Sequence, residues 1–246
     1  VDRLNGIYTQ TLENQSVTIF HERATIAGPH EIRLESGKTV TAKHILIATG
    51  ARPHVPDCPG AELGITSNEA FHLDALPGRV LIAGAGYIAN EFAGIFHQFG
   101  SKVTLINRSD QLLRGYDASL RDRLLQISVV KGIEFRFNAS FKSIEKLKNG
   151  ALRVDMTGHD PIEVDCVMFA TGRVPNIEGL GLENAGVELD ESGAIRVDEY
   201  SRTNVDHIHA VGDVTGRVQL TPVAIREGQA FADTVFGNKP TLVDYT

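Results

Sequence analysis

A glycine-rich turn between two apolar segments is the part of this sequence best suited to hold a ligand. Residues 79–83 form a short apolar run typical of a buried parallel strand, and Gly84 and Gly86 lie in the turn that follows. Because neither glycine carries a Cβ atom, a pyrophosphate can approach the backbone N–H groups at the positive end of the helix expected over residues 87–99. Ala89 takes the third small position, where helix and strand pack closely. The pattern predicts a dinucleotide site.

Two arginines after the next strand favour NADPH over NADH as the bound dinucleotide. The next strand, residues 102–106, leads into Asn107 and Arg108, roughly 20 residues beyond the glycines, where an NAD site carries an acid for the ribose 2′-hydroxyl. This chain has no acid there. Arg108 and Arg114 instead offer two cations, and guanidinium groups suit phosphate oxygens. We therefore expect NADPH rather than NADH, the alternative being that both arginines are solvated surface residues.

Composition sets limits on the class of protein. The 246 residues are enough for one large or two modest α/β domains with buried cores. A net charge of −7 argues against nucleic acid and anionic membranes as partners. No apolar stretch is long enough to cross a bilayer and no signal-peptide pattern opens the chain, so a cytoplasmic location is expected.

The two cysteines, Cys58 and Cys166, are far apart in the sequence. Cys58 lies in a loop flanked by prolines, and Cys166 lies at the head of an apolar strand. A redox pair is therefore not expected, and Cys166 is interpreted as a small buried hydrophobic residue. No metal site is expected either.

An internal repeat indicates two nucleotide-binding units of an α/β fold. The segments ILIATGAR (residues 45–52) and VMFATGRV (residues 167–174) are each an apolar strand running into Ala-Thr-Gly. Each follows an expected β-meander, the second one covering residues 133–164. The strands expected in the first meander include residues 17–20, 31–35 and 39–41.

A second candidate ligand position follows the apolar strand expected over residues 208–212. That strand leads into Asp213, and ligands bind at the carboxyl ends of strands in doubly wound sheets. A helix is expected next, with Thr221 as its N-cap, Pro222 in its first turn and Gly237 closing it. The alternatives are that Asp213 is an ordinary turn acid and that Thr221 only caps the helix.

Five segments of the chain form a recognisable set: ATGARP, GAGYIANEFAGIF, LINRSDQLLRGYD, ATGRVPN and HAVGDVTGRVQLTPVAIREGQAFAD. In their order and spacing they resemble the flavoprotein disulfide reductases, and within them the glutathione reductases. The resemblance covers essentially all 246 residues and implies a Rossmann-like, doubly wound NADPH domain inserted into part of an FAD domain of the same type. It implies that residues 1–52 end the first FAD segment, 53–175 form the NADPH domain and 176–246 return to the FAD domain.

The resemblance also implies a set of FAD-binding residues at the ends of the two strands described above. Asp213 would hold the ribityl chain of FAD. The remaining candidates line the FAD or lie at the pyrimidine edge of the flavin, and they are Ala48, Thr49, Gly50, Leu220 and Thr221.

At the nicotinamide end, Tyr87 matches the family's gate tyrosine, and Glu91 lies at i+4 on the same helix face. These two are the candidate catalytic residues, and Ile88 and Gly172 complete the expected NADPH site. Tyr8 matches a tyrosine that contacts glutathione disulfide in this family. The alternatives are that Tyr87 packs half-buried on the sheet, that Glu91 is a solvated acid and that Tyr8 belongs to the core.

The implied reaction passes hydride from NADPH to FAD, and then electrons through a redox disulfide to glutathione disulfide. The family's redox cysteines would precede Val1 and its dimer domain would follow Thr246, so we expect an inactive fragment of a homodimeric enzyme. Gln229 stands where some glutathione reductases carry arginine, which leaves trypanothione-like disulfides open. Relatives of dihydrolipoyl dehydrogenase or mercuric reductase, and an isolated non-catalytic nucleotide-binding module, also stay open.

Overall fold

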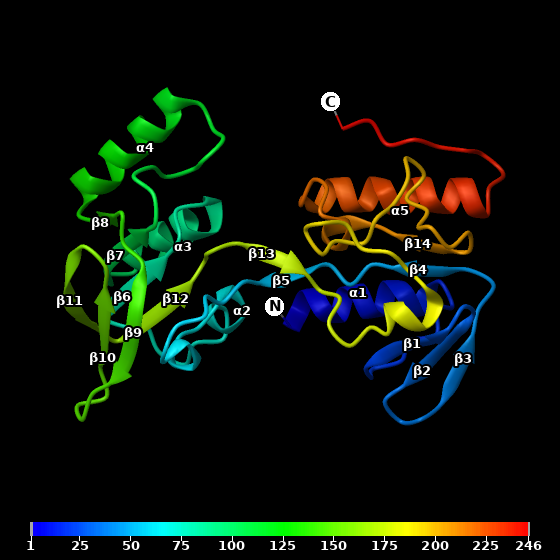
Figure 1. Ribbon diagram of the computed structural model, residues 1–246, viewed down its shortest axis with the longest axis horizontal. Helices are drawn as coiled ribbons and strands as arrows, with labels where there is room; N and C mark the ends of the chain where they lie inside the picture. Colours follow the sequence, from blue (N-terminus) through cyan, green and yellow to red (C-terminus); the bar gives the residue numbers. More distant parts are fainter. Residues whose placement is uncertain (1, 246) are drawn as a thin grey trace. The chain divides into compact units, whose positions relative to one another are not determined.

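The computed structural model describes residues 2–245, which form two compact units (Figure 1). One unit is built from two chain segments, up to Gly50 and from Pro175 onward, and the other is the intervening segment Ala51–Val174. The junctions predicted after residues 52 and 175 fall beside these boundaries. The mixture of parallel and antiparallel sheets confirms the predicted α/β fold class.

A parallel sheet of four strands forms the centre of the inserted unit, in the order β12-β6-β7-β8. Its helices, α3 (Tyr87–Gln98) and α4 (Ala118–Lys131), connect β6 to β7 and β7 to β8. The four strands are β6 (Arg79–Ala83), β7 (Lys102–Asn107), β8 (Glu134–Phe137) and β12 (Cys166–Phe169). Strand, turn and helix therefore follow one another as predicted for a dinucleotide-binding unit.

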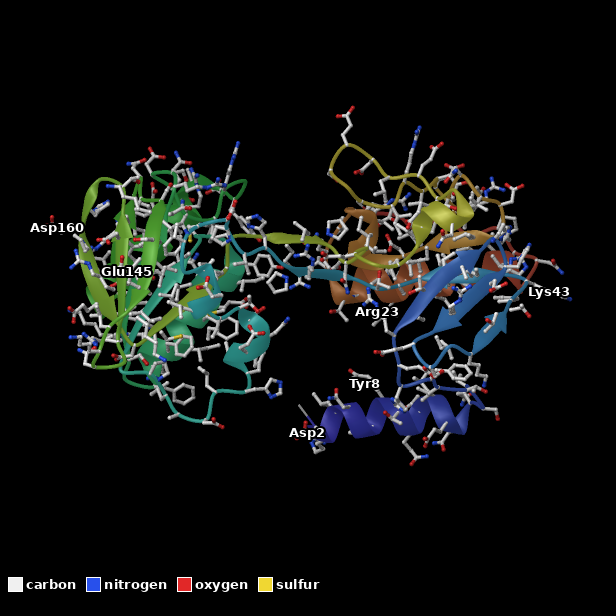
Figure 2. All side chains as sticks on the ribbon, turned by 60° about the horizontal axis from the view of Figure 1, so that its bottom comes forward. Asp2, Tyr8, Arg23, Lys43, Glu145 and Asp160 are labelled. Atoms are coloured by element: carbon white, nitrogen blue, oxygen red, sulfur yellow. The ribbon has the colours of Figure 1, made fainter. Side chains whose placement is uncertain are left out.

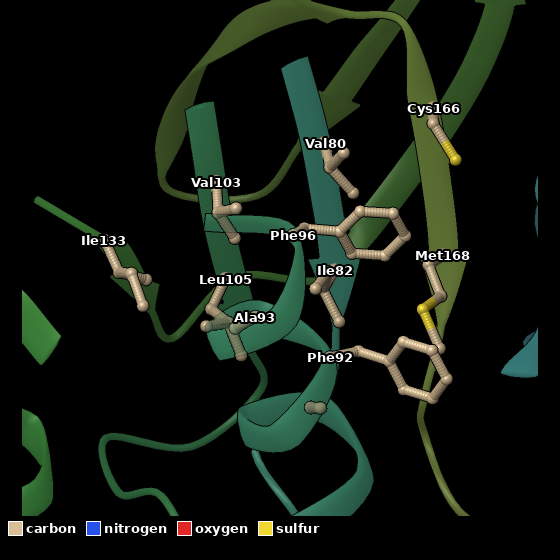
Figure 3. Packing of buried hydrophobic residues seen from close by; sticks show 11 residues of the cluster. Val80, Ile82, Phe92, Ala93, Phe96, Val103, Leu105, Ile133, Cys166 and Met168 are labelled. Atoms are coloured by element: carbon tan, nitrogen blue, oxygen red, sulfur yellow. The ribbon is translucent and has the colours of Figure 1, made fainter. Parts of the chain in front are cut away.

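Strands β6 and β12 of this sheet are apolar on both faces because both faces are covered. Val80 and Ile82 of β6 pack with Phe92 and Phe96 of α3 (Figure 3). The alternate residues of β6, among them Leu81, pack on the opposite face. This explains the continuous apolar run read from the sequence.

The opposite face of the parallel sheet is covered by an antiparallel sheet of three strands, in the order β11-β10-β9. These strands are β9 (Phe141–Lys146), β10 (Leu152–Met156) and β11 (His159–Val164). The meander predicted over residues 133–164 is therefore wrong in its first part. Residues 134–137 form β8 and pair in parallel with β7, because they follow the crossover helix α4.

The two ends of the inserted unit pair with each other. Strands β5 (Ala51–Pro53) and β13 (Arg173–Pro175) form a ribbon of two strands, and the His54 N–H donates to the Gly172 carbonyl at 2.9 Å. Between β5 and β6 lie two short helices, η1 (Ala61–Leu63) and α2 (Ser67–Ala70).

The interrupted unit combines an antiparallel and a parallel sheet around an isoleucine-rich core. Strands β4 and β14 pair in parallel, so Ile45 and Ile47 lie beside Ile208 and Ala210 in that core. Its strands are β1 (Ala24–Gly28), β2 (Glu31–Leu34), β3 (Thr39–Thr41), β4 (Ile45–Ile47) and β14 (Ile208–Ala210). Its helices are α1 (Asp2–Asn14), η2 (Leu182–Ala185), η3 (Gly212–Thr215) and α5 (Thr221–Val235).

Two predicted strands of this unit are corrected. Residues 17–20 are not a strand, and the first meander begins at β1. Val17 is 46% exposed, and its N–H donates to the Leu12 carbonyl. Val17 therefore continues the end of α1. The strand predicted over residues 208–212 ends at Ala210, because Gly212 already begins η3.

Two predicted helix caps are also corrected. The N-cap of α5 is Leu220, whose carbonyl accepts the Val223 and Ala224 N–H groups at 3.0 Å, and Thr221 is the first helical residue. A threonine cap at Thr221 would have to bind these same two N–H groups, and they donate to the Leu220 carbonyl instead. The C-cap is Phe236, and not Gly237.

Candidate functional site

The glycine turn after β6 has one tightly packed position and one open position. Gly84 has φ +115°, and a Cβ atom there would lie 2.2 Å from the Ala170 carbonyl oxygen. Gly86 is the N-cap of α3, without a side-chain cap, and a Cβ atom there would meet nothing within 4 Å. The backbone at the positive end of α3 is thus bare and faces open space, which fits the pyrophosphate of a dinucleotide.

The loop after β7 is attached to this turn. The Leu113 N–H donates to the Ala85 carbonyl at 2.8 Å, and the neighbouring Leu112 is buried. From the other side, the Asn90 side-chain amide of α3 donates to the Ala85 carbonyl at 3.0 Å and to the Gly86 carbonyl at 2.8 Å. Both hydrogen-bonding groups fix the loop and the helix relative to the glycine turn.

Asn107, which stands where an NAD site would have an acid, organises the start of the same loop. Its side-chain amide donates to Ser109 Oγ at 2.8 Å and to the Gln111 carbonyl at 2.7 Å. Arg108 and Arg114 are exposed, and within residues 2–245 neither guanidinium has an ion-pair partner. The structure therefore brings two uncompensated cations onto one loop that is tied to the glycine turn.

The first turns of α3 place the candidate nicotinamide residues on its surface. Tyr87 is 46% exposed, so about half of its surface is covered, and the alternative of a half-buried aromatic stays open. Glu91 is also exposed, at i+4. Ile88 packs with the core beneath α3, which leaves its backbone for a ligand. Gly172 lies beyond β12, with its carbonyl bound by the His54 N–H.

The candidate FAD residues lie beyond the carboxyl ends of β4 and β14. Because these strands are parallel, Ala48–Gly50 and Asp213 leave the sheet at the same edge. Asn176 holds the first of these segments, since its side-chain amide donates to the Thr49 carbonyl at 3.2 Å and its N–H to the Gly50 carbonyl at 2.9 Å. Asp213 is half-buried in η3.

The start of α5 completes this second candidate site. Leu220 is 55% exposed and makes no side-chain cap hydrogen bond. Without such a cap, the positive end of the helix can stabilise negative charge on a ligand. This arrangement fits an FAD whose polar edge lies against the helix start.

Glu227 was missed by the sequence analysis. Its side chain is buried, with 1% of the residue exposed, and its carboxylate accepts the Gly212 N–H at 2.6 Å and the Tyr245 hydroxyl at 2.7 Å. Arg217 Nη1 in turn donates to the Tyr245 oxygen at 3.0 Å. The available signal was the spacing of Glu227 from the apolar positions Ala230 and Phe231 of α5, which places it on the buried face.

Tyr8 lies on an exposed helix. Figure 2 shows it on α1, where no residue is buried and Tyr8 is 66% exposed. The alternative of a core position is therefore wrong, and the side chain is available to a ligand.

Neither cysteine resembles an activated thiol. Cys166 is buried, which raises the pKa of its thiol to about 11, and burial also raises the pKa of Cys58. Both are free thiols. Since the thiolate is the reactive form, neither thiol is poised for disulfide exchange at neutral pH.

Within the described part of the chain, no group of three or more metal-ligating side chains is found. Of the helices in residues 2–245, none is long and apolar enough to span a bilayer.

Residues 1–228 match the family described as pyridine nucleotide-disulphide oxidoreductase, and the chain belongs to this family. It is 52% identical over 239 residues to a glutathione reductase of Burkholderia cepacia, covering 97% of this chain and 53% of that protein. It is 45% identical over 238 residues to a trypanothione reductase of Trypanosoma congolense, covering 96% and 47%. The chain thus spans about half the length of these curated relatives.

A solved structure agrees with the fold. The HOCl-induced flavoprotein disulfide reductase RclA of Escherichia coli superimposes with a TM-score of 0.90 at 30% identity, covering 97% of this chain and 56% of that one. The expected cofactors, NADPH and FAD, are those of this family.

Proposed function

We propose that this chain contains the NADPH-binding and FAD-binding parts of a disulfide reductase that acts on glutathione disulfide. Unit Ala51–Val174 binds NADPH, and the interrupted unit binds FAD. The observation that carries the proposal is the pair of exposed cations, Arg108 and Arg114, on a loop hydrogen-bonded to the glycine turn. The identity to named glutathione reductases supports the substrate.

In the NADPH site, the backbone around Gly84 and Gly86 holds the pyrophosphate, and Arg108 and Arg114 hold the 2′-phosphate. Guanidinium groups suit this role because they present several donors to phosphate oxygens. The remaining contacts come from the backbone of Ile88 and from Gly172. Tyr87 gates access of the nicotinamide and Glu91 contacts the same ligand.

In the FAD site, Asp213 accepts hydrogen bonds from the ribityl hydroxyls. The start of α5 stabilises negative charge on the flavin ring. When bound, NADPH and FAD supply the hydride transfer, while the protein positions them and sets their electrostatic surroundings. The other residues proposed to line the flavin are Ala48, Thr49, Gly50, Leu220 and Thr221.

Disulfide reduction needs a pair of thiolates that this chain does not supply. Cys166 is buried with a raised pKa, and Cys58 lies on a different element. We therefore propose that the chain by itself binds nucleotides without reducing glutathione disulfide. From the resemblance to glutathione reductases we also propose that the whole protein is a homodimer. Saturating NADPH, FAD and glutathione disulfide should give no turnover; turnover that survives replacement of both cysteines by serine would contradict the proposed chemistry.

The nucleotide part is tested by comparing NADP⁺ and NAD⁺ binding in titration calorimetry. Replacing Arg108 and Arg114 by methionine removes two charge-assisted contacts of about 1.5–3 kcal/mol each, so NADP⁺ affinity should fall roughly a hundredfold or more. NAD⁺ affinity should be unchanged and serves as the internal control. An equal loss for both nucleotides would refute the role of these arginines.

A trypanothione-like disulfide is a second candidate substrate. It is favoured by Gln229, which stands where some glutathione reductases carry an arginine. The side chain of Gln229 is a neutral amide and offers a substrate no positive charge. It donates to Asp233 Oδ1 at 2.8 Å. Tyr8 contacts the substrate in either case. In the full-length protein, kcat/KM for glutathione disulfide and for trypanothione disulfide decides between the two.

A further inference from the structure

Arg121, in the first turn of α4, has an unusual environment for a helix surface. Its Nη1 donates to Gln111 Oε1 at 2.5 Å, and its Nε is buried without a hydrogen-bond partner among residues 2–245. The helix start holds the residue in place, because the Arg121 N–H donates to the carbonyl of the N-cap, Asp117, at 3.1 Å. A buried, unpaired donor costs free energy, so its presence calls for an explanation.

The partner of Arg121 belongs to the loop that carries the two proposed phosphate ligands. Gln111 lies between Arg108 and Arg114 in the sequence. Its backbone carbonyl accepts from the Asn107 amide at 2.7 Å, while its side chain accepts from Arg121. Gln111 is thus held at both ends, by β7 on one side and by α4 on the other.

Further along the same loop, the Leu113 N–H is bound to the glycine turn, immediately before Arg114. The segment from Arg108 to Arg114 is therefore held at Asn107, Gln111 and Leu113, and also at Ser109, whose carbonyl accepts the Asn138 N–H at 3.3 Å. Only the Gln111 side chain is held by a charged group. That group also brings a third positive charge to the loop.

We propose that Arg121 is a positioning residue for selection of the nucleotide 2′-phosphate, acting through Gln111 on the loop that presents Arg108 and Arg114. The inference rests on the proposed NADPH site. It predicts that a residue outside the strand–turn–helix motif determines how well the chain distinguishes NADPH from NADH. The effect is expected mainly at the 2′-phosphate, because Arg121 holds Gln111 in the arginine loop, whereas Asn90 of α3 holds the glycine turn itself.

The chain offers a matched control on the same helix. Arg123 lies two residues further along α4 and is exposed, and its side chain has no hydrogen-bond or ion-pair partner in the described chain. R121M and R123M therefore remove the same charge from the same helix, but only R121M removes the bond to Gln111.

The test is titration calorimetry of the chain with adenosine 2′,5′-bisphosphate and with 5′-AMP, which differ only in the 2′-phosphate. R121M should weaken the bisphosphate about five- to thirtyfold and leave 5′-AMP within about twofold, while R123M should leave both within about twofold. Equal effects of R121M and R123M, or equal loss of both ligands in R121M, would overturn the inference.

Q111A separates positioning from simple charge attraction. It removes the acceptor of Arg121 and leaves every charge in place, so it should weaken the bisphosphate as R121M does, and the double variant should lose little more than either single one. Additive losses, or no loss in Q111A, would show that Arg121 acts only through its charge and would overturn the positioning role. Q111A also serves if R121M fails to fold, as judged by circular dichroism.

The failure of this inference can be told apart from the failure of the proposed function. If the double variant R108M/R114M binds the bisphosphate as tightly as the wild type, the proposed NADPH site itself is wrong. If that double variant loses binding and both R121M and Q111A do not, the NADPH site stands and the role of Arg121 is refuted.

Discussion

Gly84 is the position where one added methyl group should do the most damage. In Gly84→Ala the new Cβ atom would lie 2.2 Å from the Ala170 oxygen and 2.7 Å from its carbonyl carbon, at a backbone φ of +115°. These atoms cannot swing away, because the Ala170 N–H is bound to the Ala83 carbonyl at 2.8 Å. A strained left-handed backbone costs about 1–2 kcal/mol and overpacking about 1–3 kcal/mol, so unfolding free energy should fall by about 2–5 kcal/mol.

Gly86→Ala is the matched control, since it adds the same methyl group two residues away. Gly86 has φ −74° and no atom within 4 Å of the added Cβ, so its stability should change by no more than about 1 kcal/mol. The methyl group would occupy the space proposed for the pyrophosphate, and NADP⁺ binding should be lost. Gly84→Ala should thus be unstable, and Gly86→Ala stable but unable to bind.

Urea unfolding followed by circular dichroism measures the first effect, and titration calorimetry with NADP⁺ measures the second. A Gly84→Ala variant as stable as the wild type would refute the close approach to Ala170. A Gly86→Ala variant with unchanged NADP⁺ affinity would show that the pyrophosphate lies elsewhere.

Three further predictions concern buried polar groups. The pKa of about 11 for Cys166 predicts that iodoacetamide labels this thiol at pH 8 only in urea; mass spectrometry that finds rapid labelling of the folded chain would contradict it. Glu227→Ala leaves the buried Gly212 N–H unpaired and should lower the unfolding free energy by about 1–3 kcal/mol, with a smaller loss in Glu227→Gln; equal stability of all three proteins in urea would refute this. Burial lowers the pKa of His209, so the unfolded chain binds its proton more readily, and stability should fall as pH drops below about 6.5. His209→Phe should reduce the fall in Tm between pH 7.5 and 5.5, and an unchanged fall would exclude His209 as its source.

The sequence was most informative where structure depends on near neighbours. The segment from β6 through α3 to β7 was predicted to within one residue at each end, because a run apolar on both faces and a glycine turn are both local patterns. Residues 17–20 have an equally apolar pattern, but a strand also needs a partner, and none of the described strands pairs with them. β8 was misassigned for the same reason, since its parallel pairing with β7 is decided by the fold.

The candidate sites also contain residues that local spacing reveals and residues whose partners only the folded structure reveals. The glycine turn and the two arginines could be found from spacing alone. The proposed role of Arg121 and the hydrogen-bond partners of Glu227 could not, because both depend on residues brought close by folding. Arg121 meets Gln111, ten residues away, and Glu227 meets Gly212 and Tyr245, 15 and 18 residues away.

The ribbon of β5 and β13 has a consequence for the order in which the chain folds. β4 and β14 must pair across an insertion of 124 residues (51 to 174), and closing a flexible loop of that length costs about 4 kcal/mol as (3/2)RT ln n. Once the insertion has folded, β5 and β13 hold its two ends together, so the loop left to close contains only residues 48–50 and 175–207, and its cost falls to about 3 kcal/mol. In pulse-labelled hydrogen exchange, the amides of β6, β7 and β12 should therefore gain protection before those of β4 and β14, and the reverse order would show that the interrupted unit closes on its own.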